Sequence, residues 1–191
     1  MSRMQLMDAF DTAFDEWDRL VHQVEERHWA APTPCADWDV RELLNHLISE
    51  HLWAPHLLGG ATLTEVGDRF DGDLTGTDPV AAWTEAAAGS RSAFHAPRAL
   101  DGTVYVSSGQ IPAALYCWQM TTDLAVHGWD LAHGLGITGH VIDDALATAL
   151  YERAVPQIEE WQDLGIFDPP VTVPEDASPQ DHLVALLGRT P

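Results

Sequence analysis

Apolar residues at helical spacing are the feature that most constrains what this chain can fold into. Between residues 4 and 27 they recur every three or four positions, with charged residues filling the positions between them: Met7, Phe10, Phe14, Trp17, Val21 and Val24. This period places the apolar side chains on one face of an amphipathic helix. Such a face must be buried against other elements, so the pattern predicts a helical bundle.

Helix start and stop signals continue this pattern along the chain. Asp39 is followed three residues later by Glu42, the spacing of a capping box, and Gly59-Gly60 can end that helix after about Leu58. A proline shortly after an acidic cap, or at the first helical position, marks further starts. The predicted later helices span 78–97, 112–134 and roughly 143–163.

The segments between and after these helices have compositions that predict loops, a strand and extended chain. Residues 61–77 are rich in Gly, Thr and Asp and predict a loop, whereas Thr103–Ser107 alternates and is β-prone. The proline-rich tail at 166–177 predicts extended chain, and Ser178-Pro179 predicts a last short helix ending at Gly188. We therefore expect an all-α fold: one domain, 1–191, with a four-helix bundle core at about 4–163 and a C-terminal tail at 164–191.

Charge and cysteine usage limit the classes of partner. The 191 residues carry 30 Asp and Glu against 9 basic residues, all Arg, for a formal charge of −21. A surface this acidic repels phosphate backbones and anionic lipid, so we expect neither nucleic-acid nor membrane binding. Two Cys make no disulfide framework, and no stretch predicts a signal peptide or a membrane span. We expect a cytoplasmic protein.

The fourth predicted helix carries two residues that could do chemistry. Asp123 and His127 are four positions apart on an otherwise apolar segment, so both side chains point from one face. Burying an unpaired carboxylate is costly, and a metal ion would satisfy both groups. Asp130 could hydrogen-bond the other ring nitrogen of His127. The alternative is that Asp123 and His127 are simply a buried, hydrogen-bonded pair.

The second predicted helix offers a third ligand. His46 borders the apolar face formed by Leu43, Leu44, Leu47 and Ile48, so it can point into the bundle or remain a core or rim residue. Two His and one carboxylate leave coordination positions open, as in reactive metal sites. Cys35, just before this helix, is either a thiol near the site or a small buried apolar residue. Weaker candidates are His51, His56, His133 and His140.

Three stretches resemble one family. They are Trp29 to Leu47, with the string Trp-Asp-Val-Arg-Glu-Leu-Leu-Asn-His-Leu; Thr122 to Ala132, with Val-His-Gly-Trp-Asp-Leu; and the ending from Pro174 to Arg189. Together they resemble proteins built on the metal-binding domain of mycothiol-dependent maleylpyruvate isomerase, in the wider DinB-like superfamily. The resemblance implies a DinB-like four-helix bundle. It also implies that His46, Asp123 and His127 bind a divalent metal, with zinc expected and nickel as an alternative.

The resemblance leaves three functions open. One is an isomerase or S-transferase that uses a thiol cofactor such as mycothiol and an electrophilic substrate. The second is metal-assisted hydrolysis with Glu50, one turn after His46, as the base. The third is a non-catalytic metal-binding or structural bundle. The isomerase has Glu where this chain has Asp123, and it carries a further C-terminal domain, whereas about 30 residues follow the fifth predicted helix. DinB-like bundles often pair, so a homodimer is an option.

Overall fold

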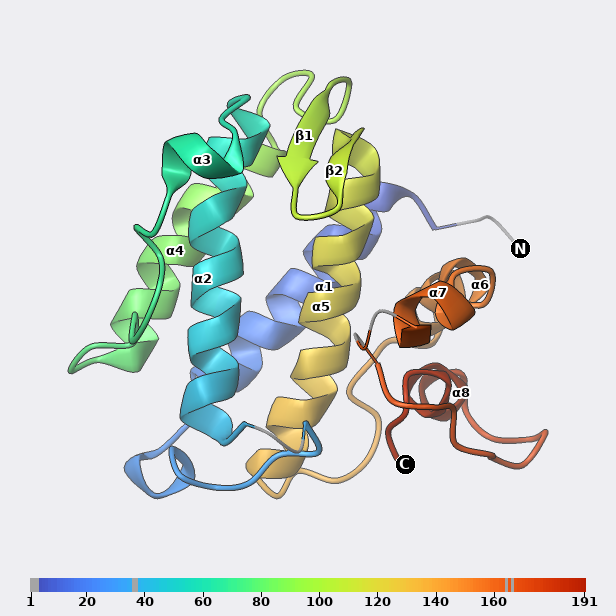
Figure 1. The fold of residues 1–191 in the computed structure, drawn as a ribbon. Coiled ribbons are helices and arrows are strands. Elements are labelled where there is room, and N and C mark those ends of the chain that lie inside the picture. Colours follow the sequence, from blue (N-terminus) through green and yellow to red (C-terminus); the bar gives the residue numbers. More distant parts are fainter. Residues whose placement is uncertain (1–3, 36–37, 164, 166) are drawn as a thin grey trace.

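The computed structural model describes residues 4–35, 38–163, 165 and 167–191, and most of them are helical (Figure 1). The helices are α1 (Leu6–Val21), α2 (Val40–Leu58), α3 (Leu63–Val66), α4 (Pro79–Phe94), α5 (Ala113–Gly134), α6 (Asp144–Ala154), α7 (Ile158–Asp163) and α8 (Pro179–Leu186). A 3-10 turn, η1, covers Glu26–His28. Two strands, β1 (Thr103–Val106) and β2 (Gly109–Pro112), precede α5.

Four long helices form the bundle core, as the apolar spacing predicted. Helix α1 packs along α5, α2 packs along α4, and α2 also contacts α5. Large side chains fill the space between them without solvent exposure, among them Phe10, Trp17, Trp83 and Leu124. The result is a pair of facing helices, α2 and α5, that carry the predicted ligands. In Figure 1 these two helices run side by side at the front of the bundle.

The β-prone segment is a strand, and it has a partner that the sequence pattern did not predict. Strand β1 pairs antiparallel with β2, with Val104 opposite Ile111 in the register. The hairpin packs on α2 and α5 at one end of the bundle (Figure 1). Val104 is buried, so one face of the hairpin closes the end of the core.

The predicted helix starts agree with the structure where caps define them. The Asp39 carboxylate accepts a hydrogen bond from the Glu42 amide at 2.9 Å, and the Glu42 carboxylate accepts one from the Asp39 amide at 3.0 Å. This is the reciprocal capping box. The loop expected at 61–77 was wrong in one place, because it contains the short helix α3. Thr62 and Glu65 form a second capping box there.

Two predicted helices are shorter than their apolar patterns. The first was expected to reach residue 27, but α1 ends at Val21, and the amides of Gln23 and Val24 bond three residues back in a tightened turn. The fifth was expected over 143–163, but it is divided into α6 and α7. Pro156 lies in the break, and a proline has no amide for the helical ladder. These C-terminal helices lie beside α5, with α6 packed on α8 (Figure 1).

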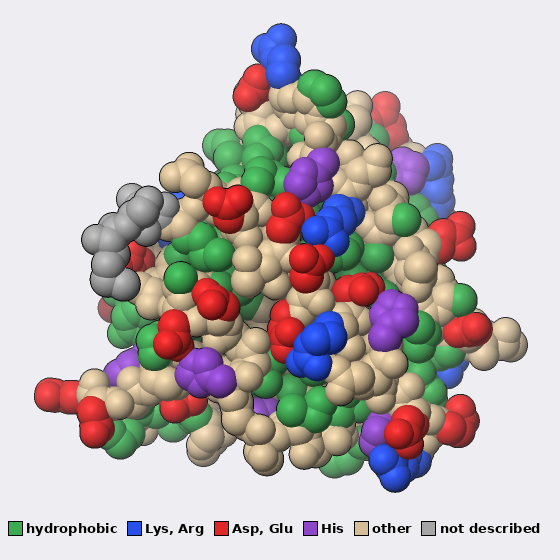
Figure 2. Space-filling view, turned by 180° about the vertical axis from the view of Figure 1, so that it is seen from behind, with side chains coloured by type: hydrophobic (Ala, Val, Ile, Leu, Met, Phe, Trp, Pro, Cys, Tyr) green, Lys and Arg blue, Asp and Glu red, His purple; other side chains and the backbone are tan. Residues whose placement is uncertain are grey.

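The acidic surplus is spread over the surface. Figure 2 shows the face opposite to that of Figure 1, where acidic side chains are scattered and basic side chains occur in a few places. One cross-helix ion-pair group joins Arg91 of α4 to α1, with Asp15 at 2.6 Å and Asp11 at 3.1 Å. Within the described part of the chain, no helix is both long and apolar enough to cross a membrane.

Candidate metal centre

Helices α2 and α5 bring the three predicted ligands together. The Nε2 atom of His46 lies 3.1 Å from Oδ2 of Asp123, and Nε2 of His127 lies 3.4 Å from Oδ1 of the same carboxylate. One ligand atom from each residue lies within 4.8 Å of the other two. His46 and Asp123 are 77 positions apart in the sequence, so the cluster depends on the packing of α2 against α5.

A chain of hydrogen bonds fixes the orientation of His127. Its Nδ1 atom lies 2.9 Å from Oδ2 of Asp130, the partner that the spacing on this helix suggested. Asp130 is fully buried, and Arg189 donates to it from Nη2 at 2.9 Å and from Nε at 3.3 Å. A carboxylate on one ring nitrogen selects the tautomer that presents the other nitrogen to a metal. Sequence reasoning missed Arg189, because its partner lies 59 residues away.

Charges within the cluster shift its pKa values strongly. Burial disfavours the charged forms of all three groups, but the attraction between the carboxylate and the two imidazoles outweighs it. The pKa of Asp123 is held well below its usual range, while the pKa of His46 is raised and that of His127 is raised to about 9. Without a metal ion, the cluster therefore contains a carboxylate and at least one imidazolium at neutral pH.

Two residues from the loop before α2 complete the surroundings. The Trp38 indole stacks on the His46 ring, with centroids 4.7 Å apart, and it also contacts the His127 ring at 5.7 Å. Cys35 is half-buried, and a ligand atom from it lies within 4.8 Å of ligand atoms from His127 and Asp130. The thiol thus lies beside the site, as one of the two interpretations of Cys35 proposed.

The donor set suits a divalent transition metal. Imidazole nitrogens and a carboxylate oxygen are the ligands of zinc in open, reactive sites. The donor atoms face one another, and His127 already has a buried carboxylate on its second nitrogen, as metal-binding histidines usually do. The residues present therefore fit the group that the sequence resemblance implied.

Comparison with known proteins decides the family. The family model described as the mycothiol maleylpyruvate isomerase N-terminal domain matches residues 10–132, a span that includes His46, Asp123 and His127. The chain belongs to this family. Its helical bundle is accordingly the DinB-like helical domain. No solved structure matches the chain significantly.

The family match extends to curated relatives along the whole chain. Two uncharacterised proteins from two strains of Mycobacterium tuberculosis are each 29% identical to it over 193 aligned positions. The alignments cover 98% of this chain and 99% of each relative. The C-terminal segment after residue 132, outside the match to the family model, is therefore shared with these relatives.

In this member of the mycothiol maleylpyruvate isomerase N-terminal domain family, the cluster opens onto a cavity of about 810 Å³. His46 and Asp123 line it, together with Glu50, Tyr116 and the β1–β2 turn. Burial raises the pKa of Glu50, and the nearby charge of Asp123 raises it further. Burial also raises the pKa of Tyr116 well above its usual value, so this phenol stays protonated. The cavity therefore offers both a carboxylate and a phenol beside the cluster.

The weaker histidine candidates lie elsewhere. His51 points to the opposite side of α2, where it is fully buried and its Nδ1 lies 2.8 Å from the Ser90 hydroxyl. His133 bonds the backbone of its own helix through the Trp129 carbonyl. His140 is exposed and pairs with Asp144 at 2.6 Å. His56 packs against the Phe70 ring. None of these four belongs to the cluster.

Proposed function

We propose that this protein binds one divalent metal ion through His46, Asp123 and His127 and uses it in thiol-dependent isomerisation or S-transfer. The observation that carries the proposal is the convergence of three donor atoms, two of which belong to residues that line a large cavity, His46 and Asp123. A closed structural zinc site has four protein ligands, whereas three ligands next to a cavity suit a site that receives a substrate or a cofactor.

Each residue has a separate task in this proposal. A metal ion held here supplies a Lewis acid that lowers the pKa of a thiol or water bound to it. Asp130 and Arg189 hold His127 in one orientation. Trp38 covers the imidazoles on one side and limits the access of water. Zinc is the metal we favour, with nickel as the alternative, because both accept imidazole and carboxylate ligands.

The proposed thiol is mycothiol, and the support for it is the family. The matching family model takes its name from mycothiol maleylpyruvate isomerase. The thiolate would add to an electrophilic carbon of the substrate. For an isomerase it is expelled again after rotation about the carbon–carbon bond, whereas for an S-transferase it stays attached.

Metal content tests the ligand set. Purified wild-type protein is measured by elemental analysis, beside His127→Ala and the matched control His140→Ala, whose imidazole pairs with Asp144 away from the cluster. We expect near-stoichiometric zinc or nickel in the wild type and in His140→Ala, and little in His127→Ala. A wild type that takes up no metal even after incubation with zinc would remove the basis of the proposal.

Thiol dependence tests the reaction class. The zinc-loaded protein is mixed with mycothiol and a panel of electrophiles, and loss of free thiol and isomerisation are followed separately. Activity that needs mycothiol and disappears in His127→Ala supports the proposal. Activity without any thiol contradicts it and supports hydrolysis instead.

Glu50 makes metal-assisted hydrolysis the second candidate. Its carboxylate lines the same cavity as His46 and Asp123, and its pKa is raised by burial and then by Asp123. A carboxylate with a raised pKa is better suited to accept a proton from water near neutral pH. Glu50→Gln should then abolish thiol-independent hydrolysis while metal content stays at the wild-type level, since Glu50 is outside the ligand cluster.

A further inference from the structure

A second, smaller cavity adjoins the one beside the metal cluster. We call it the aromatic slot, and its main lining residues are Leu115, Trp118, Arg153, Gln157, Trp161 and Phe167. Its volume is about 210 Å³. Asp123 lines both cavities, as do Leu115, Gln119, Gln157 and Trp161. The aromatic slot is therefore a side compartment of the cavity onto which the proposed metal ligands open.

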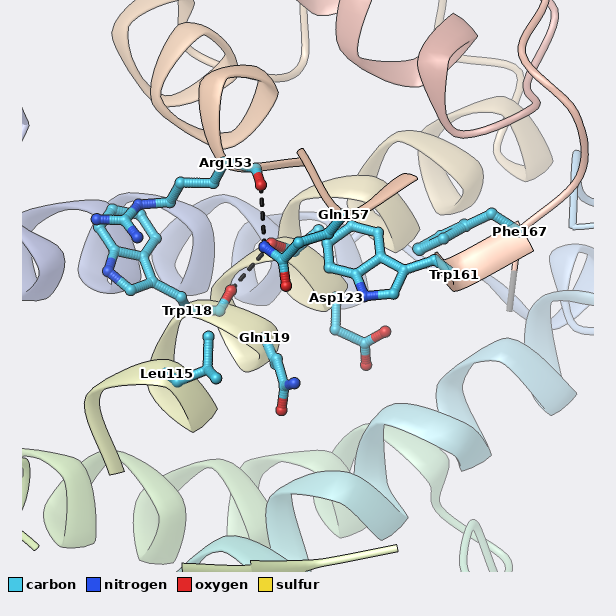
Figure 3. A pocket seen from close by; sticks show the side chains of 9 residues that line it. Leu115, Trp118, Gln119, Asp123, Arg153, Gln157, Trp161 and Phe167 are labelled. Atoms are coloured by element: carbon cyan, nitrogen blue, oxygen red, sulfur yellow. Dashed lines mark hydrogen bonds between the residues drawn. The ribbon is translucent and has the colours of Figure 1, made fainter. Parts of the chain in front are cut away.

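Arg153 gives one end of the aromatic slot a positive charge. Its guanidinium carbon lies 3.7 Å above the Trp118 ring, so the flat faces of the two groups stack. Stacking engages the face of a guanidinium, and the N–H groups in the plane of a guanidinium match the two oxygens of a carboxylate. Figure 3 shows Arg153 and Trp118 together on one side of the slot.

Aromatic rings form the other end. Trp161 and Phe167 pack with their ring centroids 5.6 Å apart, and both line the slot. Figure 3 shows the Trp161 indole next to the Asp123 carboxylate, with Phe167 beyond it. The slot thus has a cationic end at Arg153 and an aromatic end at Trp161 and Phe167, and the Asp123 carboxylate, one of the proposed metal ligands, lies next to the Trp161 indole.

We propose that the aromatic slot binds a planar aromatic monocarboxylate, with its carboxylate on Arg153 and its ring among Trp118, Trp161 and Phe167. A cavity of about 150 Å³ suffices to hold benzene, so a slot of about 210 Å³ has room for an aromatic ring with a small substituent. The inference deepens the proposed function by naming the class of electrophile: the end of the ligand remote from its carboxylate would face Asp123.

The lining of the two cavities favours one carboxylate on this ligand over two. Arg153 is the only arginine among the described residues that line them, whereas His46 lines the larger cavity together with the acidic groups Glu50, Asp123 and Glu160. A guanidinium is therefore available to a carboxylate at the Arg153 end of the slot alone. The apolar rings also favour a ring over a small, strongly hydrated dianion.

Binding of trans-cinnamate, followed by calorimetry and by tryptophan fluorescence, tests the proposal. Cinnamamide has the same shape without the charge, and maleate is a small dianion. We expect wild-type protein to bind cinnamate at least tenfold more tightly than cinnamamide or maleate. Arg153→Gln should lose about tenfold in cinnamate affinity and less than twofold in cinnamamide affinity, and Phe167→Ala should weaken both. The matched control is Arg98→Gln, an exposed arginine that pairs with Asp101 near its own position.

Three results would overturn the proposal: no saturable cinnamate binding at millimolar concentrations, equal affinity for cinnamate and cinnamamide, or a charge preference that survives in Arg153→Gln. Retained cinnamamide binding and an unchanged circular dichroism spectrum show that Arg153→Gln is folded. The titrations use metal-free and zinc-loaded protein without thiol. Cinnamate binding in a protein that takes up no zinc would defeat the proposed function alone, and zinc uptake without cinnamate binding would defeat the aromatic slot alone.

Discussion

Arg189, the third-last residue of the described chain, donates two hydrogen bonds to the buried carboxylate of Asp130. Asp130 in turn holds Nδ1 of His127, so the last turn of the tail reaches the proposed metal ligand through one intermediate side chain. The tail is held there by α8, whose Leu183 and Val184 are fully buried. The end of the chain, from α8 to Arg189, therefore acts on the site through Asp130 and His127, and none of its residues lines the cavity.

We predict that Arg189→Gln weakens zinc binding by about ten- to a hundredfold, because the carboxylate that orients His127 loses its cationic partner. The free energy of unfolding should also fall, by roughly 3 kcal/mol, since Asp130 remains as a buried charge with less compensation. Zinc affinity is measured by competition with a chelator, and stability by urea unfolding of the metal-free protein.

Arg189→Lys separates orientation from stability in this experiment. A lysine restores the charge but has no planar fork, so stability should recover more than zinc affinity does. Arg98→Gln, far from the cluster, should change neither. Wild-type zinc affinity in Arg189→Gln would show that Asp130 holds His127 without help from the tail.

Proton release should accompany metal binding. The pKa of His127 is raised to about 9, so this imidazole is protonated in the metal-free protein at neutral pH and must lose its proton to become a ligand. Zinc affinity should therefore rise about tenfold per pH unit as the pH increases from 7 towards 9, and level off above that value. Calorimetry in buffers of different ionisation enthalpy should find at least one proton released at pH 7. Binding without proton release would contradict an imidazolium in the metal-free cluster.

The parts of the fold set by local signals were predictable from the sequence, and the parts set by distant packing were not. The capping box at Asp39 and the helical spacing of Asp123, His127 and Asp130 located α2, α5 and most of the site. The contact between His46 and Asp123 was implied only by the family resemblance, because the sequence of one helix does not show which other helix packs against it. The Arg189–Asp130 pair, the β1–β2 pairing and the break near Pro156 had weak local signals or none.

His51 should make the protein sensitive to acid. Full burial lowers the pKa of His51 to about 3, and its Nε2 has no hydrogen-bond partner among the described residues. The unfolded chain takes up a proton on this residue below about pH 6.5, whereas the folded chain does not until about pH 3. As the pH is lowered from 6.5 to 3, this group should therefore reduce the free energy of unfolding by about 1.4 kcal/mol per pH unit. Above pH 6.5 it should have no effect on the free energy of unfolding.

Replacing His51 together with its partner tests this slope. The double variant His51→Leu/Ser90→Ala removes the titrating ring and the hydroxyl that bonds it, so no new orphaned polar group is created. Urea unfolding is measured between pH 4 and pH 7, and the free energy of unfolding is plotted against pH. The slope of this plot gives the number of protons taken up on unfolding, and that number should be smaller by up to one in the double variant than in the wild type. His140→Gln, an exposed histidine, should keep the wild-type slope. An unchanged slope in the double variant would assign the acid sensitivity to other groups.

A pair of glycines on α5 tests how closely α5 must approach α2. A Cβ atom on Gly134 would lie 2.7 Å from Cγ2 of Val40, the fully buried and stiff first residue of α2, whereas one on Gly128 would lie 3.9 Å from its nearest neighbour, Leu20. Gly134→Ala should therefore destabilise the protein by roughly 1–3 kcal/mol through overpacking. Gly128→Ala should stabilise it by about 0.5–1 kcal/mol, because alanine restricts the unfolded chain more and makes only ordinary contact.

Thermal and urea unfolding measure the change in stability of both variants, and a second substitution tests whether overpacking causes the loss in Gly134→Ala. Val40→Ala removes the methyl group that Gly134→Ala would strike, so the double variant should lose less stability than the sum of the two single changes. Additive losses would mean that α5 is not in close contact with α2 at this point. If the contact does set the spacing of the two helices, zinc affinity should also be lower in Gly134→Ala than in Gly128→Ala, because His46 lies on one helix and Asp123 and His127 lie on the other.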